Sequence, residues 1–220
     1  MAWGPASSRA SPHAGPSSCY NAAMQADVGV LGGVFDPIHY GHLWAAEAVA
    51  EKLDLETVLF VPVGTPPHKP SCGVAGAVHR AEMVRIAIAG NPRFRLHTAE
   101  IDRPGPSYSV DTVQELLSAG RRPLVILGID AFALIRTWHR WGDLLRLAPV
   151  ALVGRPGYDM RDALALAAEL GATVACVEET PGVAVSSTAL RERLVAGGSV
   201  RYLVPESVAD YIGANRLYRP

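Results

Sequence analysis

The 220-residue chain carries 20 Lys and Arg residues against 21 Asp and Glu residues, so no global charge recommends a nucleic acid or an anionic membrane as its partner. Its three cysteines are far apart and form no CxxC pair, which disfavours a disulfide framework and a zinc site and favours a reducing cytoplasm. Prolines, glycines and charges interrupt each apolar run before the roughly 20 residues that a membrane-spanning helix needs, and the length suits one compact domain.

The first 26 residues are rich in Ala, Ser, Pro and Gly and show little apolar periodicity. Such a segment buries too little surface to offset its ordering entropy, so we predict a disordered tail over residues 1–26. Pro5, Pro12 and Pro16 also break the continuous apolar stretch that a secretory signal requires. The predicted domain therefore covers residues 27–220.

The domain opens with a pattern that predicts a strand, a loop, a helix and a second strand. Residues 27–33 form a short β-prone run that ends in glycines, and residues 41–53 carry apolar side chains at helical spacing. Residues 57–63 (TVLFVPV) are almost all apolar, which suits a strand that is buried on both faces of a parallel sheet.

The alternation of helices and strands continues to the end of the chain. Strands are expected over residues 93–97, 123–128, 150–154 and 173–177, and helices over residues 79–89, 111–119, 160–170, 187–196 and 205–214. This order predicts a single α/β domain with a doubly wound parallel sheet and C-terminal helices. Ligands of such sheets bind beyond the carboxyl ends of the strands, so the loops that follow strands should carry the chemistry.

The loop after the first predicted strand, GGVFDPIHYGH at residues 32–42, places two histidines beside glycines at a helix start. Glycines let backbone amides approach an anion closely, and a helix N-terminus supplies free N–H groups and partial positive charge. A lone histidine is more often an ordinary surface residue. Because His39 and His42 are three residues apart and face one crevice, the pattern predicts a site for a triphosphate.

A second polar cluster, SSTALR at residues 186–191, places hydroxyl groups at a helix start and an arginine one turn later. Taken alone, the cluster indicates an ordinary helix cap. Trp138 and Trp141 are also three residues apart, a spacing that indicates core packing on one helical face, and we accept this interpretation for Trp141. Cys176, His97 and His139 have no evident partner, so we treat them as core or surface residues.

The motif at residues 32–42 resembles the signature of the HxGH nucleotidylyltransferases, specifically the bacterial nicotinate-mononucleotide adenylyltransferases of NAD synthesis. Further similar segments follow in the same order between Gly29 and Tyr218: PPHK at 66–69, PSYS at 106–109, Asp130, Trp138, RPGY at 155–158 and VSST at 185–188 with Arg191. The resemblance implies a Rossmann-like nucleotidylyltransferase fold. It also implies transfer of the adenylyl group of ATP to nicotinate mononucleotide, with release of pyrophosphate.

The resemblance assigns catalysis to His39 and His42, and the acceptor to Ser107, Tyr108 and Trp138, whose ring would stack on the pyridine. It assigns the binding of ATP and its phosphates to Gly32, Gly33, Phe35, Lys69, Gly128, Asp130, Arg155, Ser186, Ser187, Thr188 and Arg191. It implies Mg²⁺ held mainly through substrate phosphates, with no protein metal ligands. Non-functional alternatives stay open for two of these residues: Lys69 as a solvated surface side chain and Asp130 as a helix cap.

Three positions depart from the family pattern. Val34 stands where Thr or Ser is usual, Ser109 stands where Thr is common, and Ile129 replaces a small or polar residue and is expected to narrow the pocket. Phosphopantetheine and nicotinamide mononucleotide are alternative acceptors, and a homo-oligomer stays open. An oxidoreductase or a non-catalytic nucleotide-binding module is the rival class, which the absence of GxGxxG after the first strand disfavours.

Overall fold

The computed structural model describes residues 25–65, 75–177 and 185–219. The predicted tail over 1–26, apart from its last two positions, and Lys69 lie outside the described residues. None of the described helices is both long and apolar enough to cross a membrane.

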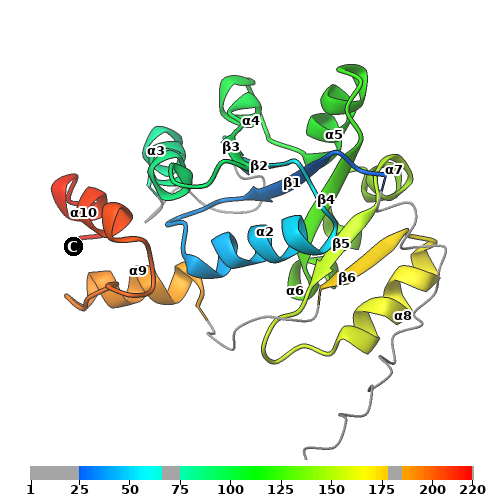
Figure 1. Cartoon of the computed structure of the whole chain (residues 1–220). Coiled ribbons are helices and arrows are strands. Elements are labelled where there is room, and N and C mark those ends of the chain that lie inside the picture. Colours follow the sequence, from blue (N-terminus) through cyan, green and yellow to red (C-terminus); the bar gives the residue numbers. More distant parts are fainter. Residues whose placement is uncertain (1–24, 66–74, 178–184, 220) are drawn as a thin grey trace, which may run out of the picture.

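The core of the protein is a parallel six-stranded sheet with the order β3-β2-β1-β4-β5-β6 (Figure 1). The register pairs Val30 of β1 with Leu59 of β2 on one side and with Val125 of β4 on the other. The strands are β1 (Val28–Gly33), β2 (Thr57–Pro62), β3 (Phe94–Leu96), β4 (Pro123–Gly128), β5 (Val150–Val153) and β6 (Val174–Val177). The predicted doubly wound parallel sheet is confirmed.

Helices cover both faces of this sheet, and Figure 1 shows α2 running along one of them. The described helices are α2 (Tyr40–Lys52), α3 (Ala77–Ile88), α4 (Ala99–Asp102), α5 (Ser109–Ser118), α6 (Ile129–Phe132), the 3₁₀ helix η1 (Ile135–Thr137), α7 (Trp141–Leu147), α8 (Met160–Leu170), α9 (Ser187–Val195) and α10 (Glu206–Ala214). The predicted C-terminal helices are therefore present, whereas α4, α6, η1 and α7 were not predicted.

The alternation of side chains along β4 explains the two layers of core. Leu124 and Ile126 belong to a cluster with the apolar residues of α2, α3 and α10, whereas Val125 and Leu127 belong to a cluster with α5, α7 and α8. Successive side chains of a strand point to opposite faces, so an apolar run is buried on both sides. This burial explains why the PLVILG segment reads as continuous hydrophobic sequence.

The order of the strands creates a crevice at the carboxyl ends of the central strands β1 and β4. From β1 the chain winds outward through β2 to β3, and then it returns to place β4 on the other side of β1. Such a reversal separates the loops beyond the carboxyl ends of the two central strands, and ligands bind in the gap. The loop after β1 and the start of α6 after β4 flank this switch point.

Candidate active site

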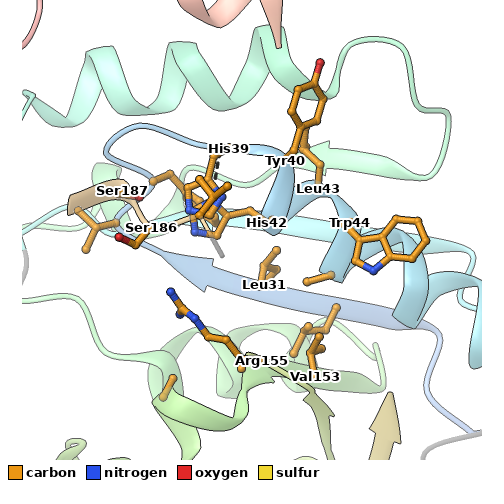
Figure 2. Close-up of a pocket in the computed structure, with 18 of the residues that line it drawn as sticks. Leu31, His39, Tyr40, His42, Leu43, Trp44, Val153, Arg155, Ser186 and Ser187 are labelled. Carbon is orange, nitrogen blue, oxygen red and sulfur yellow. Dashed lines mark hydrogen bonds between the residues drawn. The ribbon is translucent and has the colours of Figure 1, made fainter. Parts of the chain in front are cut away.

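A cavity of about 1060 Å³ lies at the switch point. Figure 2 shows the histidines of α2 on one side of it, with Arg155 and Val153 opposite and the Ser186-Ser187 segment beside the histidines. Of the residues assigned by the sequence, the cavity is lined by Gly32, Phe35, His39, His42, Gly128, Asp130, Trp138, Arg155, Ser186, Ser187, Thr188 and Arg191. The fold thus gathers segments that are far apart in the chain.

The two histidines stand at the N-terminus of α2, where His39 is the N-cap and His42 lies in the first turn. Their rings stack with centroids 3.7 Å apart, and the His42 Nδ1 atom accepts a hydrogen bond from the His39 backbone N–H at 3.3 Å. A Cβ atom at Gly41 would lie 3.0 Å from the His39 Nδ1 atom, which explains the glycine between them. Because Nδ1 of His42 accepts, the proton of a neutral His42 ring sits on Nε2.

Both histidines are neutral at physiological pH. Burial lowers the pKa of His39 to about 4, with a further contribution from the Arg155 charge. Burial also lowers the pKa of the half-buried His42 well below its usual value, assisted by His39 and Arg155. The rings therefore act as hydrogen-bond donors and not as fixed cations.

The low pKa of His39 makes the free energy of unfolding depend on pH. Between pH 6.5 and 4 the unfolded chain binds a proton that the folded His39 does not, so stability rises with pH over this window. We expect acidification from pH 7.5 to 4.5 to destabilise the wild type by about 2 to 3 kcal/mol more than His39→Gln. Urea unfolding of both proteins at the two pH values measures this difference, and an equal loss in both would contradict the assignment.

Asp130 of α6, after β4, and Arg155 in the loop after the neighbouring strand β5 form an ion pair in the wall of the cavity. The helix-cap alternative for Asp130 is wrong, because Gly128 is the N-cap of α6 and no side chain caps this helix. Arg155 brings a positive charge to the wall opposite the histidines, as Figure 2 shows. A triphosphate in the cavity would meet this charge.

The cluster at residues 186–191 is both a helix cap and part of the cavity wall. Ser186 Oγ accepts a hydrogen bond from the Ala189 N–H at 3.2 Å, which confirms the capping interpretation. Ser187 Oγ donates to the Pro37 carbonyl at 3.0 Å, and Arg191 Nη1 donates to the Asp36 carbonyl at 2.8 Å. These bonds dock the start of α9 onto the histidine loop, so hydroxyls, guanidinium and imidazoles converge.

The residues assigned to the acceptor are only partly gathered in the cavity. Trp138 lines it, but Ser107 and Tyr108 do not. The Ser107 hydroxyl accepts from the Gly64 N–H at 3.0 Å and donates to the Glu100 carbonyl at 3.1 Å. It therefore links the loop after β2 to α4. Tyr108 stacks on His139 with ring centroids 4.0 Å apart, a pairing that the sequence analysis missed.

Two expectations about neighbouring residues need correction. Trp138 and Trp141 do not share a helical face, because Trp138 follows η1 and Arg140, in the left-handed region at φ 50°, precedes α7. Trp141 does pack against the core cluster that includes α5, α7 and α8, as expected. Ile129 is 2% exposed and belongs to the same cluster, so it fills core space and does not narrow the cavity.

The structure adds three residues that the sequence analysis did not select. Arg80 of α3 is fully buried and donates to the carbonyls of Val34 and Gly64, in the loops after β1 and β2. Asp36, inside the histidine motif, and Tyr218, near the end of the chain, form a hydrogen bond of 2.6 Å. Asp36 stood in the quoted motif, but no local signal marked Arg80 or Tyr218.

Comparisons with known proteins identify the family of the chain. A sequence model of the cytidylyltransferase-like family matches residues 30–193. The probable nicotinate-nucleotide adenylyltransferase of Symbiobacterium thermophilum is 47% identical over 198 residues, which cover 88% of this chain and 95% of that protein. The chain belongs to the nicotinate-nucleotide adenylyltransferase family. The probable family member of Mycobacterium tuberculosis strain H37Rv is 42% identical over 87% of this chain and 91% of its own length.

Solved structures of the same family support the fold. A Plasmodium falciparum nicotinic acid mononucleotide adenylyltransferase complexed with NaAD superposes with a TM-score of 0.72 over 88% of this chain and 97% of that chain, at 19% identity. At this identity the likeness concerns the fold alone. It confirms the predicted Rossmann-like nucleotidylyltransferase architecture.

Proposed function

We propose that this chain joins the adenylyl group of ATP to nicotinate mononucleotide, giving nicotinate adenine dinucleotide and pyrophosphate. The observation that carries the proposal is the pair of neutral histidines at the N-terminus of α2, which lies beside Arg191 and faces Arg155 across one cavity. A site with several phosphate-binding groups and no evident nucleophile suits phosphoryl-group transfer by positioning. Membership of the family supports the same reaction.

In the proposed reaction a 5′-phosphate oxygen of nicotinate mononucleotide attacks the α-phosphorus of ATP. The new P–O bond forms as the bond between the α-phosphorus and the bridging oxygen breaks, and pyrophosphate leaves with that oxygen. His42 would donate its Nε2–H to the α-phosphate, together with free N–H groups of α2. Arg191 and the Thr188 hydroxyl would hold the β- and γ-phosphates and then pyrophosphate, whereas the Ser187 hydroxyl already donates to the Pro37 carbonyl.

The residues around the cavity fit a magnesium ion that is held mainly by phosphates. Within residues 25–65, 75–177 and 185–219, no three His, Cys, Asp or Glu side chains converge into a metal site. The Asp130 carboxylate lines the cavity, and Mg²⁺ prefers oxygen ligands and retains waters. We propose that Asp130 holds the ion through water, and the bound ion would neutralise charge on the phosphates.

The acceptor assignment rests on Trp138, the aromatic side chain at the end of η1 that lines the cavity. A flat indole suits stacking on a pyridine ring, whereas the pantetheine arm of phosphopantetheine offers no ring. Roles for Ser107 and Tyr108 toward the acceptor, and for Lys69 toward phosphate, stay predictions. We also propose that residues 27–220 form the catalytic domain and that it acts in the cytoplasm, where its proposed donor ATP is made.

The proposed function is tested by incubating the purified chain with ATP, Mg²⁺ and one acceptor at a time. We expect pyrophosphate and nicotinate adenine dinucleotide to form with nicotinate mononucleotide, at a kcat/KM at least about tenfold above that with nicotinamide mononucleotide. Phosphopantetheine should give no product. Equal kcat/KM for the acid and the amide would contradict the specificity, and no pyrophosphate with any acceptor would favour a nucleotide-binding module.

A further inference from the structure

Asp36 is a buried carboxylate in the middle of the histidine loop, with 1% of its surface exposed. Its Oδ1 atom accepts hydrogen bonds from the Ala75 N–H at 3.0 Å and from the Tyr218 hydroxyl at 2.6 Å. Its Oδ2 atom lies 3.5 Å from the Arg191 guanidinium and has no hydrogen-bond donor among the described residues. The Asp36 carboxylate therefore contacts both Tyr218 and Arg191, the arginine of the 186–191 cluster.

Tyr218 reaches Asp36 from a part of the chain that is otherwise remote from the cavity. It lies after α10, 182 positions from Asp36, and does not itself line the cavity. Its backbone adopts φ 59°, in the left-handed region, which is unfavourable for a residue with a side chain. The burial of its phenol and its bond to Asp36 both raise the pKa of Tyr218, so the hydroxyl keeps its proton and donates.

We propose that Tyr218 is a positioning residue for adenylyl transfer, which acts through Asp36 to hold Arg191 in place for the ATP phosphates. The inference rests on the proposed function, because it takes Arg191 as a ligand of the triphosphate. Tyr218 fixes the orientation of the Asp36 carboxylate. Asp36 in turn orients the Arg191 guanidinium through its backbone carbonyl and its Oδ2 atom. A hydrogen bond to a charged group is strong enough to impose such an orientation.

We expect loss of the Tyr218 hydroxyl alone to weaken this arrangement. Without it, Oδ1 keeps only the Ala75 N–H, and the buried carboxylate is left short of donors. A donor that can compensate is the Arg191 guanidinium, 3.5 Å from Oδ2, which would turn further toward this atom and leave its position for the phosphates. The expected effect is therefore weaker binding of ATP, with no change in the binding of the acceptor.

The test compares Tyr218→Phe with Tyr211→Phe in the full chain. Tyr211 on α10 is a matched control, because its hydroxyl also makes one hydrogen bond, to His79 Nδ1 at 2.9 Å, without contact to Asp36 or Arg191. We measure the KM for ATP and for nicotinate mononucleotide, the Kd of a non-hydrolysable ATP analogue by calorimetry, and Tm. Tyr218→Phe should raise the KM for ATP and the Kd of the analogue about fivefold and leave the acceptor KM unchanged.

Tyr211→Phe should leave all three constants within twofold of the wild type, even where Tm falls. A double-mutant cycle adds Asp36→Ala, which removes the oxygen that accepts from Tyr218, and Tyr218→Phe should have no further effect on the Kd in that background. Analogue binding by Tyr218→Phe within twofold of the wild type, or an equal loss in Tyr211→Phe, would overturn the inference alone. A wild-type chain that does not bind the analogue would overturn the proposed function as well.

Discussion

Replacement of His42 by alanine is expected to lower the kcat of adenylyl transfer by about 100- to 1000-fold. The imidazole is neutral because burial lowers its pKa, and its Nδ1 atom accepts the His39 N–H, so only Nε2 remains as a donor. A donor that is held in place before the reaction stabilises charge on the α-phosphate without reorganisation. Steady-state kinetics with saturating ATP and nicotinate mononucleotide measure the loss.

Two controls separate the loss of the donor from damage to the fold. His42→Asn keeps a side chain that is able to accept the His39 N–H, and it should preserve the far-UV spectrum and still lose most of the turnover. His79→Ala removes a histidine of α3 that bonds Tyr211 outside the cavity, and it should retain turnover within about threefold. Near-normal turnover of a folded His42→Ala protein would contradict the assigned role.

Replacement of Arg80 by methionine is expected to reduce the free energy of unfolding by about 3–5 kcal/mol. The Arg80 guanidinium donates to the carbonyls of Ala75 at 3.0 Å, Val34 at 2.8 Å and Gly64 at 3.0 Å. Methionine fills a similar volume but leaves these partly buried acceptors unpaired, and each unpaired group carries a desolvation penalty. Urea denaturation at pH 7.5 measures the change.

Arg85→Met is the matched control for this prediction, because Arg85 lies on the same helix and pairs with Glu82 at the surface. Exposed pairs of this kind contribute about 0.2 to 1 kcal/mol, so the control should change stability little. Arg80→Lys keeps the charge but not the fork of donors, and it should lose most of the same stability. A change below about 1 kcal/mol in Arg80→Met would show that the three carbonyls find other partners.

The fold was predictable wherever hydrophobic pattern and helix signals coincided. The strand over 123–128 and the helix over 160–170 match β4 and α8 at both ends, and Asp159 accepts from the Arg161 N–H at the start of α8 as a capping residue should. The four-residue helices α4 and α6 were missed because they are too short to show a period of 3.6 residues. Both helices contact strands in the fold, α4 contacting β2 and α6 contacting β4.

The site was predictable where its groups lie in compact motifs, as with His39, His42 and Arg191. The contacts that hold those groups in place were not predictable, because they join distant positions. Arg80 bonds Val34 over 46 positions, and Tyr218 bonds Asp36 over 182 positions. A single sequence carries periodicity and spacing, but it does not show which buried polar group meets which partner.

The central claim is that the switch-point cavity holds the reacting phosphates against the histidines of α2. A crystal structure of the chain with nicotinate adenine dinucleotide tests it most directly. We predict that the diphosphate of the dinucleotide lies within hydrogen-bonding distance of His42 Nε2, that the nicotinate ring stacks on Trp138, and that the adenosine lies on the Arg155 side. A dinucleotide bound with its diphosphate away from the α2 N-terminus would contradict the account.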